Sequence, residues 1–102
     1  MASGLKSIFT DDLDHCIICG RPAERHHIFG KFSRKKSEED GLILPLCPEH
    51  HTEGKNAVHL NYDMRRLTYI LGQYAWESQY DGIAPKEVAR DLFRERYVKS
   101  YL

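Results

Sequence analysis

The 102-residue sequence lacks any apolar stretch that approaches the roughly 20 residues needed to cross a lipid bilayer. The segment from Met1 to Lys6 also lacks the apolar centre of a secretory signal peptide. Neither sign of charge is in excess, because 15 Lys and Arg residues balance 15 Asp and Glu residues. We therefore expect a cytoplasmic protein without a membrane partner, and the net charge does not indicate what else it binds.

Cysteine is scarce, and its count of three is odd. Three cysteines would leave an unpaired thiol in a secreted protein, whereas in a reducing compartment they can act together as metal ligands. Internal repeats and low-complexity segments are absent, and a chain of this length has little room for a second core. We expect a polar lead-in over residues 1–14 and one domain over residues 15–102, which a structural metal would help to stabilise.

Metal-binding side chains are concentrated in the middle of the chain. Two residues separate Cys16 from Cys19, and Cys47 is followed by His50 and His51. Two such knuckles can hold one tetrahedral Zn²⁺ ion, with either histidine as the fourth ligand, because zinc tolerates both spacings. The alternative is a set of buried free cysteines, which the paired spacing disfavours. The sequence predicts a zinc site with three sulfur ligands and one nitrogen ligand.

A second histidine pair, His26-His27, is left over after the zinc ligands are assigned. Neighbouring side chains on a regular strand point to opposite faces, so one histidine can bind a metal while the other faces a substrate. An isolated pair of this kind is more often structural or at the surface. This pair lies between the two knuckles and within a basic segment, which favours an active site beside the zinc.

The basic segment spans residues 21–36, where six Lys and Arg residues occur with one acidic residue, Glu24. Such a local excess of positive charge is a candidate contact surface for the phosphates of a nucleic acid. The residues expected to bind DNA are Arg25, Lys31, Arg34, Lys35 and Lys36.

The hydrophobic pattern predicts an α+β fold with short strands over residues 25–29 and 42–46, and with Pro45 at an edge or a strand end. The charged stretch over residues 33–41 is expected to be a loop. Apolar residues at three- and four-residue steps predict helices over residues 63–79 and 85–99. We expect Trp76, with Tyr80, Tyr97 and Tyr101, to belong to the core rather than to stack on bases.

The run His26-His27-Ile28, followed by the segment GLILPLCPEHH at 41–51, resembles the HNH endonucleases, the zinc-stapled branch of the ββα-metal (His-Me finger) nucleases. The segments RKKSE at 34–38 and AVHLN at 57–61 resemble small HNH proteins of phages and prophages. The resemblance covers residues 15–102. It implies a treble-clef-like ββα core over residues 15–62, a helical tail over residues 63–102, and a phage or prophage protein in a bacterial cytoplasm.

By position, the resemblance implies that His26 binds a catalytic metal and that His27 is the general base. It assigns His50 to the zinc and His51 to the catalytic metal. His59, eight residues past His51, is a candidate third metal ligand or phosphate contact, or else a surface histidine at the start of a helix. The family usually has an Asn at the start of the second strand, where this chain has Leu42. A backbone carbonyl is therefore a candidate for the group that orients the base.

The implied activity is hydrolysis of phosphodiester bonds, with double-stranded DNA as the expected substrate. A divalent cation stabilises charge at the scissile phosphate, and histidine can accept the proton of water near pH 7. Mg²⁺ prefers oxygen ligands, so a site with two imidazoles would also suit Mn²⁺, Co²⁺, Ni²⁺ or Zn²⁺. The alternative, favoured by Leu42, is a catalytically inactive zinc module that binds DNA or a phage protein. The histidine pattern argues against a third reading, a redox or metal-storage protein.

Overall fold

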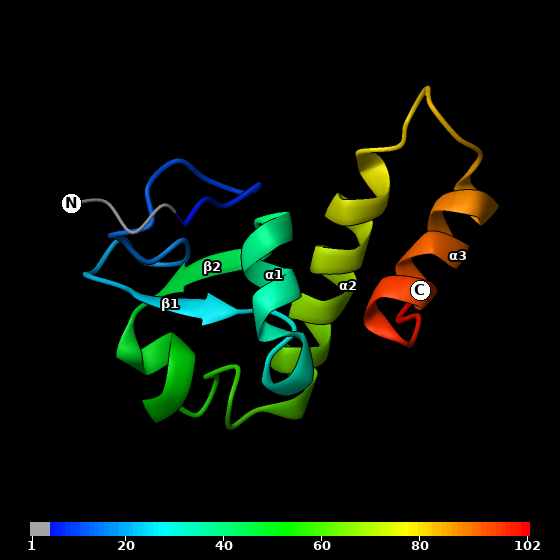
Figure 1. The fold of residues 1–102 in the computed structure, drawn as a ribbon. Helices are drawn as coiled ribbons and strands as arrows, with labels where there is room; N and C mark the ends of the chain where they lie inside the picture. The colour runs from blue at the N-terminus through cyan, green and yellow to red at the C-terminus, as the bar shows by residue number, and fades with distance from the viewer. Residues whose placement is uncertain (1–4) are drawn as a thin grey trace.

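The computed structural model describes residues 5–102, so the first four residues of the lead-in, including most of the segment inspected for a signal peptide, lie outside the described residues. Within that range a two-stranded antiparallel sheet packs with helices, which makes the fold α+β as expected (Figure 1). Strand β1 covers Glu24–His27 and strand β2 covers Ile43–Leu46. Their register pairs Glu24 with Leu46 at one end and His27 with Ile43 at the other.

The strands are joined by a 3₁₀ turn, η1 (Lys31–Ser33), and a short helix, α1 (Arg34–Asp40). A π-helical turn, η2 (Glu49–Glu53), follows β2. The chain then forms the helices α2 (Tyr62–Ser78) and α3 (Lys86–Tyr97). Figure 1 shows α2 and α3 side by side, away from the segment over residues 5–23 that precedes β1. The predicted strands and C-terminal helices are thus confirmed to within a few residues at each end.

The predicted loop over residues 33–41 is wrong, because most of this stretch forms α1. The helical sequence RKKSEED contains no apolar residue, and Ser37 is the one member that is buried. An amphipathic pattern therefore could not reveal the helix. Tertiary contacts hold it instead, since the Asp40 carboxylate accepts hydrogen bonds from the side chains of Trp76, Arg96 and Tyr97.

The core lies between the sheet and the helical tail, and aromatic rings make up much of it. The ring centroid of Phe29 lies 4.7 Å from that of Tyr97 and 5.5 Å from that of Phe93. Trp76 is buried against Phe93, with 5.5 Å between the ring centroids. Tyr80 and Tyr101 pack against this cluster. The prediction that Trp76 and these tyrosines form core is confirmed.

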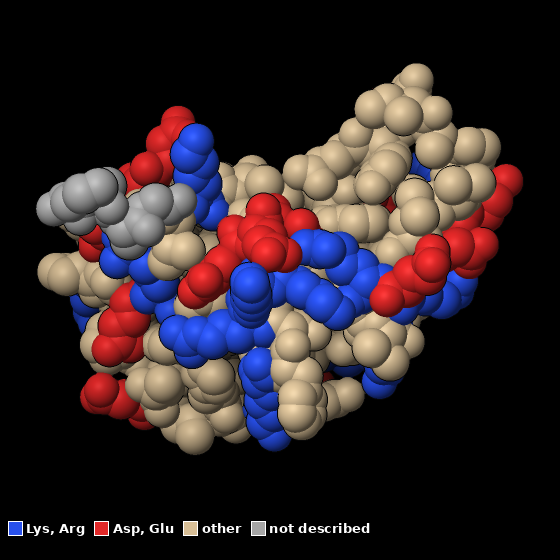
Figure 2. All heavy atoms as spheres, viewed as in Figure 1, with Lys and Arg blue, Asp and Glu red and all other residues tan. Residues whose placement is uncertain are grey.

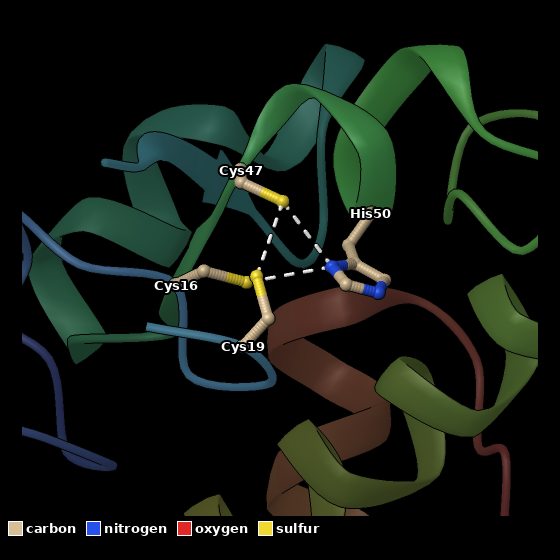
Figure 3. Close-up of side chains that lie close together, drawn as sticks. All are labelled: Cys16, Cys19, Cys47 and His50. Carbon is tan, nitrogen blue, oxygen red and sulfur yellow. Dashed lines mark hydrogen bonds between the residues drawn. The ribbon is translucent and has the colours of Figure 1, made fainter. Parts of the chain in front are cut away.

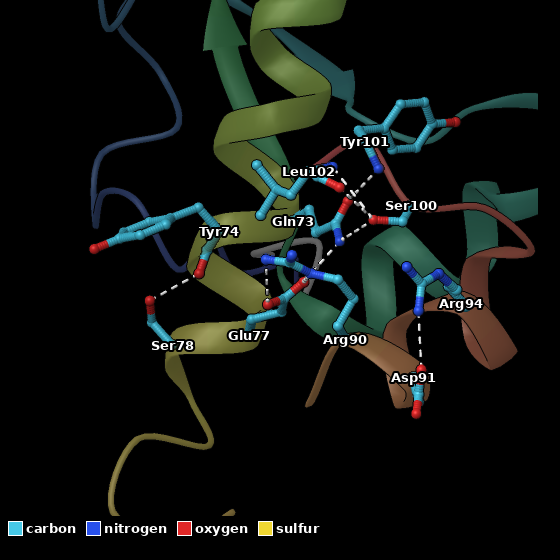
Figure 4. Close-up of polar contacts among 10 residues, drawn as sticks. All are labelled: Gln73, Tyr74, Glu77, Ser78, Arg90, Asp91, Arg94, Ser100, Tyr101 and Leu102. Carbon is cyan, nitrogen blue, oxygen red and sulfur yellow. Dashed lines mark hydrogen bonds and ion pairs between the residues drawn. The ribbon is translucent and has the colours of Figure 1, made fainter. Parts of the chain in front are cut away.

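The end of the chain is attached to α2 through a buried amide. Gln73 is fully buried, and its side-chain nitrogen donates hydrogen bonds to Glu77 and Ser100 (Figure 4). Its side-chain oxygen accepts the backbone N–H of Tyr101. Glu77 also forms an ion pair with Arg90 of α3. The helical tail therefore has polar connections of its own in addition to the aromatic packing.

Candidate metal centres

Four side chains that the sequence predicts as zinc ligands converge in the structure (Figure 3). Their ligand atoms all lie within 4.8 Å of one another. The Sγ atoms of Cys19 and Cys47 are 3.6 Å apart, and His50 Nδ1 lies 3.2 Å from Cys47 Sγ and 3.6 Å from Cys16 Sγ. Ligands of a tetrahedral zinc ion lie about 3.5–3.8 Å apart, so this cluster has dimensions that could hold a metal ion.

Two tight turns present these ligands. The backbone N–H of Gly20 donates to Cys16 O, and the N–H of Cys16 donates to Arg21 O, which closes the first knuckle. In the second knuckle, the N–H groups of His50 and His51 both donate to Cys47 O. The first knuckle precedes β1 and the second follows β2. Because Glu24 pairs with Leu46, both knuckles lie at the same end of the sheet, and the cluster connects them there.

The pKa values of Cys16 and Cys19 in this cluster are shifted in opposite directions. Burial disfavours the Cys16 thiolate, but hydrogen bonds from backbone groups of Cys47 and Cys19 outweigh burial and lower the Cys16 pKa to about 6. The pKa of Cys19 is raised: the backbone of Arg21 lowers it, but desolvation and the adjacent Cys47 and Cys16 thiols outweigh that effect. A cation between the sulfur atoms would stabilise the Cys19 thiolate, which the neighbouring thiols otherwise disfavour. Thiolates are the form of cysteine that binds a metal.

A second cluster consists of His26 from β1, His51 from η2 and His59, which precedes α2. One ring nitrogen from each lies within 4.8 Å of the others. The Nε2 atoms of His51 and His59 are 3.1 Å apart. The backbone N–H of His59 donates to His51 O at 3.0 Å, which sets the two residues side by side. The structure thus brings together the three histidines expected at a catalytic metal.

His26 Nε2 is a buried nitrogen without a protein partner among the described residues, as expected of a metal ligand. Within residues 5–102 it is the one fully buried side-chain nitrogen or oxygen without a hydrogen-bond partner. A buried polar atom left unpaired is costly and calls for an explanation such as a bound ion. Burial, followed by the nearby His51, His59 and His27, lowers the His26 pKa to about 3. The ring is therefore neutral at physiological pH, as a metal ligand must be.

The neighbours of His59 and His51 also favour metal binding by these two histidines. Burial, His51 and Arg65 lower the pKa of His59, which favours its neutral form. His51 Nδ1 lies 2.8 Å from Glu24 Oε1, so its Nε2 is the nitrogen that faces the cluster. A carboxylate on the outer nitrogen of a ligating histidine fixes the orientation and the tautomer of the ring. Sequence reasoning missed this role of Glu24, since no spacing rule relates it to His51.

His27 occupies a different environment from its neighbour His26. Its Nε2 lies 2.8 Å from Oε1 of Glu38 on α1, and its side chain is 6% exposed. No other hydrogen bond of this ring is present in residues 5–102. Leu42, in the position expected for Asn, is completely buried in the core. The group beside His27 is thus the Glu38 carboxylate and not the backbone carbonyl suggested from the sequence.

The five residues expected to bind DNA fall into two groups. Arg25 lies 3.6 Å from Asp14 in an ion pair, and the Lys36 ammonium donates to Arg96 O. The other three are exposed and form no ion pair within residues 5–102; they are Lys31, Arg34 and Lys35. Figure 2 shows Lys and Arg side chains in a band across the middle of the face where Figure 1 shows α1.

Comparison with known proteins gives one partial likeness. No family model matches the chain, and no solved structure matches it. The chain is similar to Intron Large complex component GCFC2 of Mus musculus, with 29% identity over 68 residues. The match includes 67% of this chain but 9% of the relative, and it does not establish a family. None of the helices in the described part of the chain is long and apolar enough to cross a membrane.

Proposed function

We propose that the protein is a metal-dependent HNH endonuclease with a ββα-metal core, which hydrolyses phosphodiester bonds of DNA. The observation that carries this proposal is the meeting of His26, His51 and His59 beside a separate four-ligand cluster. His26 lies on β1 and His51 on η2, which directly follows β2, and this order of strand, strand and helical turn, with η1 and α1 inserted between the strands, supports a ββα core. A single structural metal would not require the second cluster, which supports a separate role for it.

Zinc is the metal we assign to Cys16, Cys19, Cys47 and His50. Thiolate ligands favour Zn²⁺ over Mg²⁺ or Mn²⁺, and four protein ligands leave no position for a substrate. The role of this site is therefore structural. It fastens the segment before β1 to η2, and η2 carries His51 of the second cluster.

Three histidine nitrogens leave positions open for water and for a phosphate oxygen. A divalent cation held there would neutralise charge at the scissile phosphate and lower the pKa of bound water. Nitrogen ligands suit Mn²⁺, Ni²⁺ or Zn²⁺ better than Mg²⁺, which prefers oxygen. Glu24 orients His51, and the buried His26 supplies a neutral nitrogen that has no competing partner.

His27 acts as the general base in this proposal. Glu38 at Nε2 holds the tautomer that carries its proton on Nε2, so Nδ1 is free to accept the proton of the attacking water. Glu38 thereby performs the orienting task that Leu42 cannot perform, since an aliphatic side chain neither donates nor accepts hydrogen bonds. The exposed Lys31, Arg34 and Lys35 lie on the segment that leads from β1 into α1, where they can hold DNA phosphates near the histidines.

The test is incubation of the purified protein with supercoiled plasmid in EDTA, Mg²⁺, Mn²⁺ or Ni²⁺. We expect cleavage with at least one metal and none in EDTA. His51→Ala should not cleave while retaining the metal of the Cys-containing cluster, as measured by elemental analysis. His15→Ala is a matched control, because His15 is an exposed histidine that pairs with Asp12 outside both clusters.

A catalytically inactive zinc module is the second candidate, and the small exposure of the His27 side chain favours it. Such a module would bind DNA, or a phage protein, without cutting. In the plasmid assay it would leave the DNA supercoiled with every metal, even in protein shown by elemental analysis to carry metal at both clusters. That result would reject the nuclease proposal.

A further inference from the structure

Phe32 is completely exposed, unlike the other aromatic residues near it. Its relative accessible surface is 100%, whereas that of Phe29 is 6% and that of Phe93 is 0%. Burying a Phe side chain stabilises a protein, and this exposed residue contributes no such stabilisation. Single exposed apolar residues are ordinary on protein surfaces, so exposure alone assigns no role. The residues around Phe32 are what indicate a role for it.

Phe32 lies at the centre of η1, between the strand that carries the histidines and the helix that carries Glu38. Lys31 immediately before it has a φ of 51°, a left-handed conformation that is uncommon for residues other than glycine. Lys31, Arg34 and Lys35 surround the ring in sequence and form no ion pair within the described residues. The turn thus presents one free aromatic ring among three free cations.

We propose that Phe32 stacks on a nucleobase of the bound DNA while Lys31, Arg34 and Lys35 hold its phosphates. The inference rests on the proposed DNA-cleaving function and adds a base contact to it. Proteins that bind DNA strands combine cationic side chains along the backbone with aromatic rings on which bases stack. Because both faces of the Phe32 ring are free, an unpaired base can reach it without any rearrangement of the protein.

The base that stacks on Phe32 could come from single-stranded DNA or from a duplex. An unpaired base in a single-stranded segment can stack directly, and a ring can also insert between base pairs of a duplex that bends. The complete exposure of the ring favours the unpaired base, because opening a duplex costs additional free energy. Binding measurements on single-stranded and duplex DNA of the same sequence distinguish the two.

The experiment measures fluorescence anisotropy of labelled oligonucleotides without added catalytic metal, so that the DNA stays intact and the protein keeps its bound zinc. We compare wild type, Phe32→Ala and Phe32→Trp. Ile83→Ala is a matched control, because Ile83 is 77% exposed but lies in the α2–α3 loop, far from η1 in Figure 1. Circular dichroism checks that each variant is folded.

We expect Phe32→Ala to weaken binding of the single strand on the order of tenfold, the usual effect of removing one stacked ring. Phe32→Trp should bind like wild type. Its tryptophan fluorescence should also be quenched by DNA, beyond any quenching of the buried Trp76 in wild type. Ile83→Ala should not change the affinity. A loss of similar size on the duplex would support stacking by insertion between base pairs.

Two results would overturn the inference, and they differ in what else they reject. If wild type binds DNA and Phe32→Ala binds both DNA forms equally well, stacking is wrong while the proposed function stands. If wild type binds neither DNA form, the proposed nuclease function fails and the stacking inference fails with it.

Discussion

His50 and His51 are consecutive residues of η2, yet they belong to two clusters of different chemistry. The cluster of His50 has three sulfur atoms and four ligands in all, whereas that of His51 has three nitrogen atoms and no sulfur. Burial does not separate the two clusters, because each contains both buried and exposed members. In the proposed function, this difference in ligand number and ligand type separates a structural site from a reactive one. Each prediction below tests that division.

The largest effect is expected when the sulfur cluster loses a ligand. Cys47→Ser should unfold the domain, because the free energy of zinc binding in small zinc domains, about 10–16 kcal/mol, exceeds the stability of most folds. Wild type should contain about one equivalent of zinc at this site, consistent with one tetrahedral staple. Elemental analysis and circular dichroism measure both quantities. A fully folded protein without zinc would contradict the assignment.

The direct comparison is between His50→Ala and His51→Ala. We expect His50→Ala to lower the melting temperature and to release zinc, whereas His51→Ala should abolish metal-dependent cleavage and keep the zinc. Thermal unfolding, metal content and plasmid cleavage are measured on the same preparations. If His51→Ala loses the zinc and His50→Ala loses activity alone, the assignment of the two histidines is reversed.

His27 belongs to neither cluster, so its replacement should affect rate alone. His27→Ala should reduce the cleavage rate on the order of 10²–10⁴-fold, the usual effect of removing acid–base catalysis. The fold, the zinc content and the affinity for DNA should not change. Cleavage near the wild-type rate, in a preparation free of contaminating nuclease, would remove His27 from the mechanism and favour the inactive DNA-binding module.

A smaller effect is expected at the carboxylate that holds this base. Glu38→Gln should slow cleavage by about tenfold to a hundredfold, as loss of outer partners of functional histidines does. Glu39→Gln is the matched control, because Glu39 is the next residue of α1 and pairs with Arg96 instead. Equal rates for both variants would show that Glu38 does not position His27.

The smallest effect is expected in the helical tail, where neither metal should be affected. Tyr97→Phe removes hydrogen bonds to Asp40 and to Lys36 O, which should cost about 1–2 kcal/mol of unfolding free energy. Urea unfolding and metal analysis test this. A loss of either metal would show that the tail and the clusters are energetically coupled.

The same variant gives a pH dependence. Burial, followed by Asp40, raises the pKa of Tyr97 above the ordinary value of 10.0. The unfolded chain therefore loses this proton first, so wild type keeps full stability below pH 10 and loses stability as the pH rises beyond it. Tyr97→Phe lacks that loss. The difference in stability between the two proteins should narrow above pH 10, and a constant difference would contradict this account.

The zinc ligands could be predicted because cysteine is scarce and the two knuckles have a spacing that suits zinc coordination. The second set could be predicted because histidines remained after the zinc was assigned, and the resemblance to HNH endonucleases divided His50 from His51. The sequence also predicted α2 and α3, because their apolar residues recur with the helical period. Helix α1 was missed because its stabilising contacts lie in other elements. Glu24 and Glu38 were missed for the same reason, since each meets its histidine across 27 and 11 residues of chain that only the fold brings together.

The contacts of Asp40 limit how far the helical tail of this protein can be shortened. Its carboxylate is held by one residue of α2 and two of α3, and it ends the helix that carries Glu38. A fragment that stops after α2 would contain every proposed metal ligand and His27, the proposed general base. It would nevertheless leave a half-buried negative charge without its arginine, and α1 would lose the contacts that hold it. Shortening the protein for use as a fusion partner should therefore preserve residues 86–97.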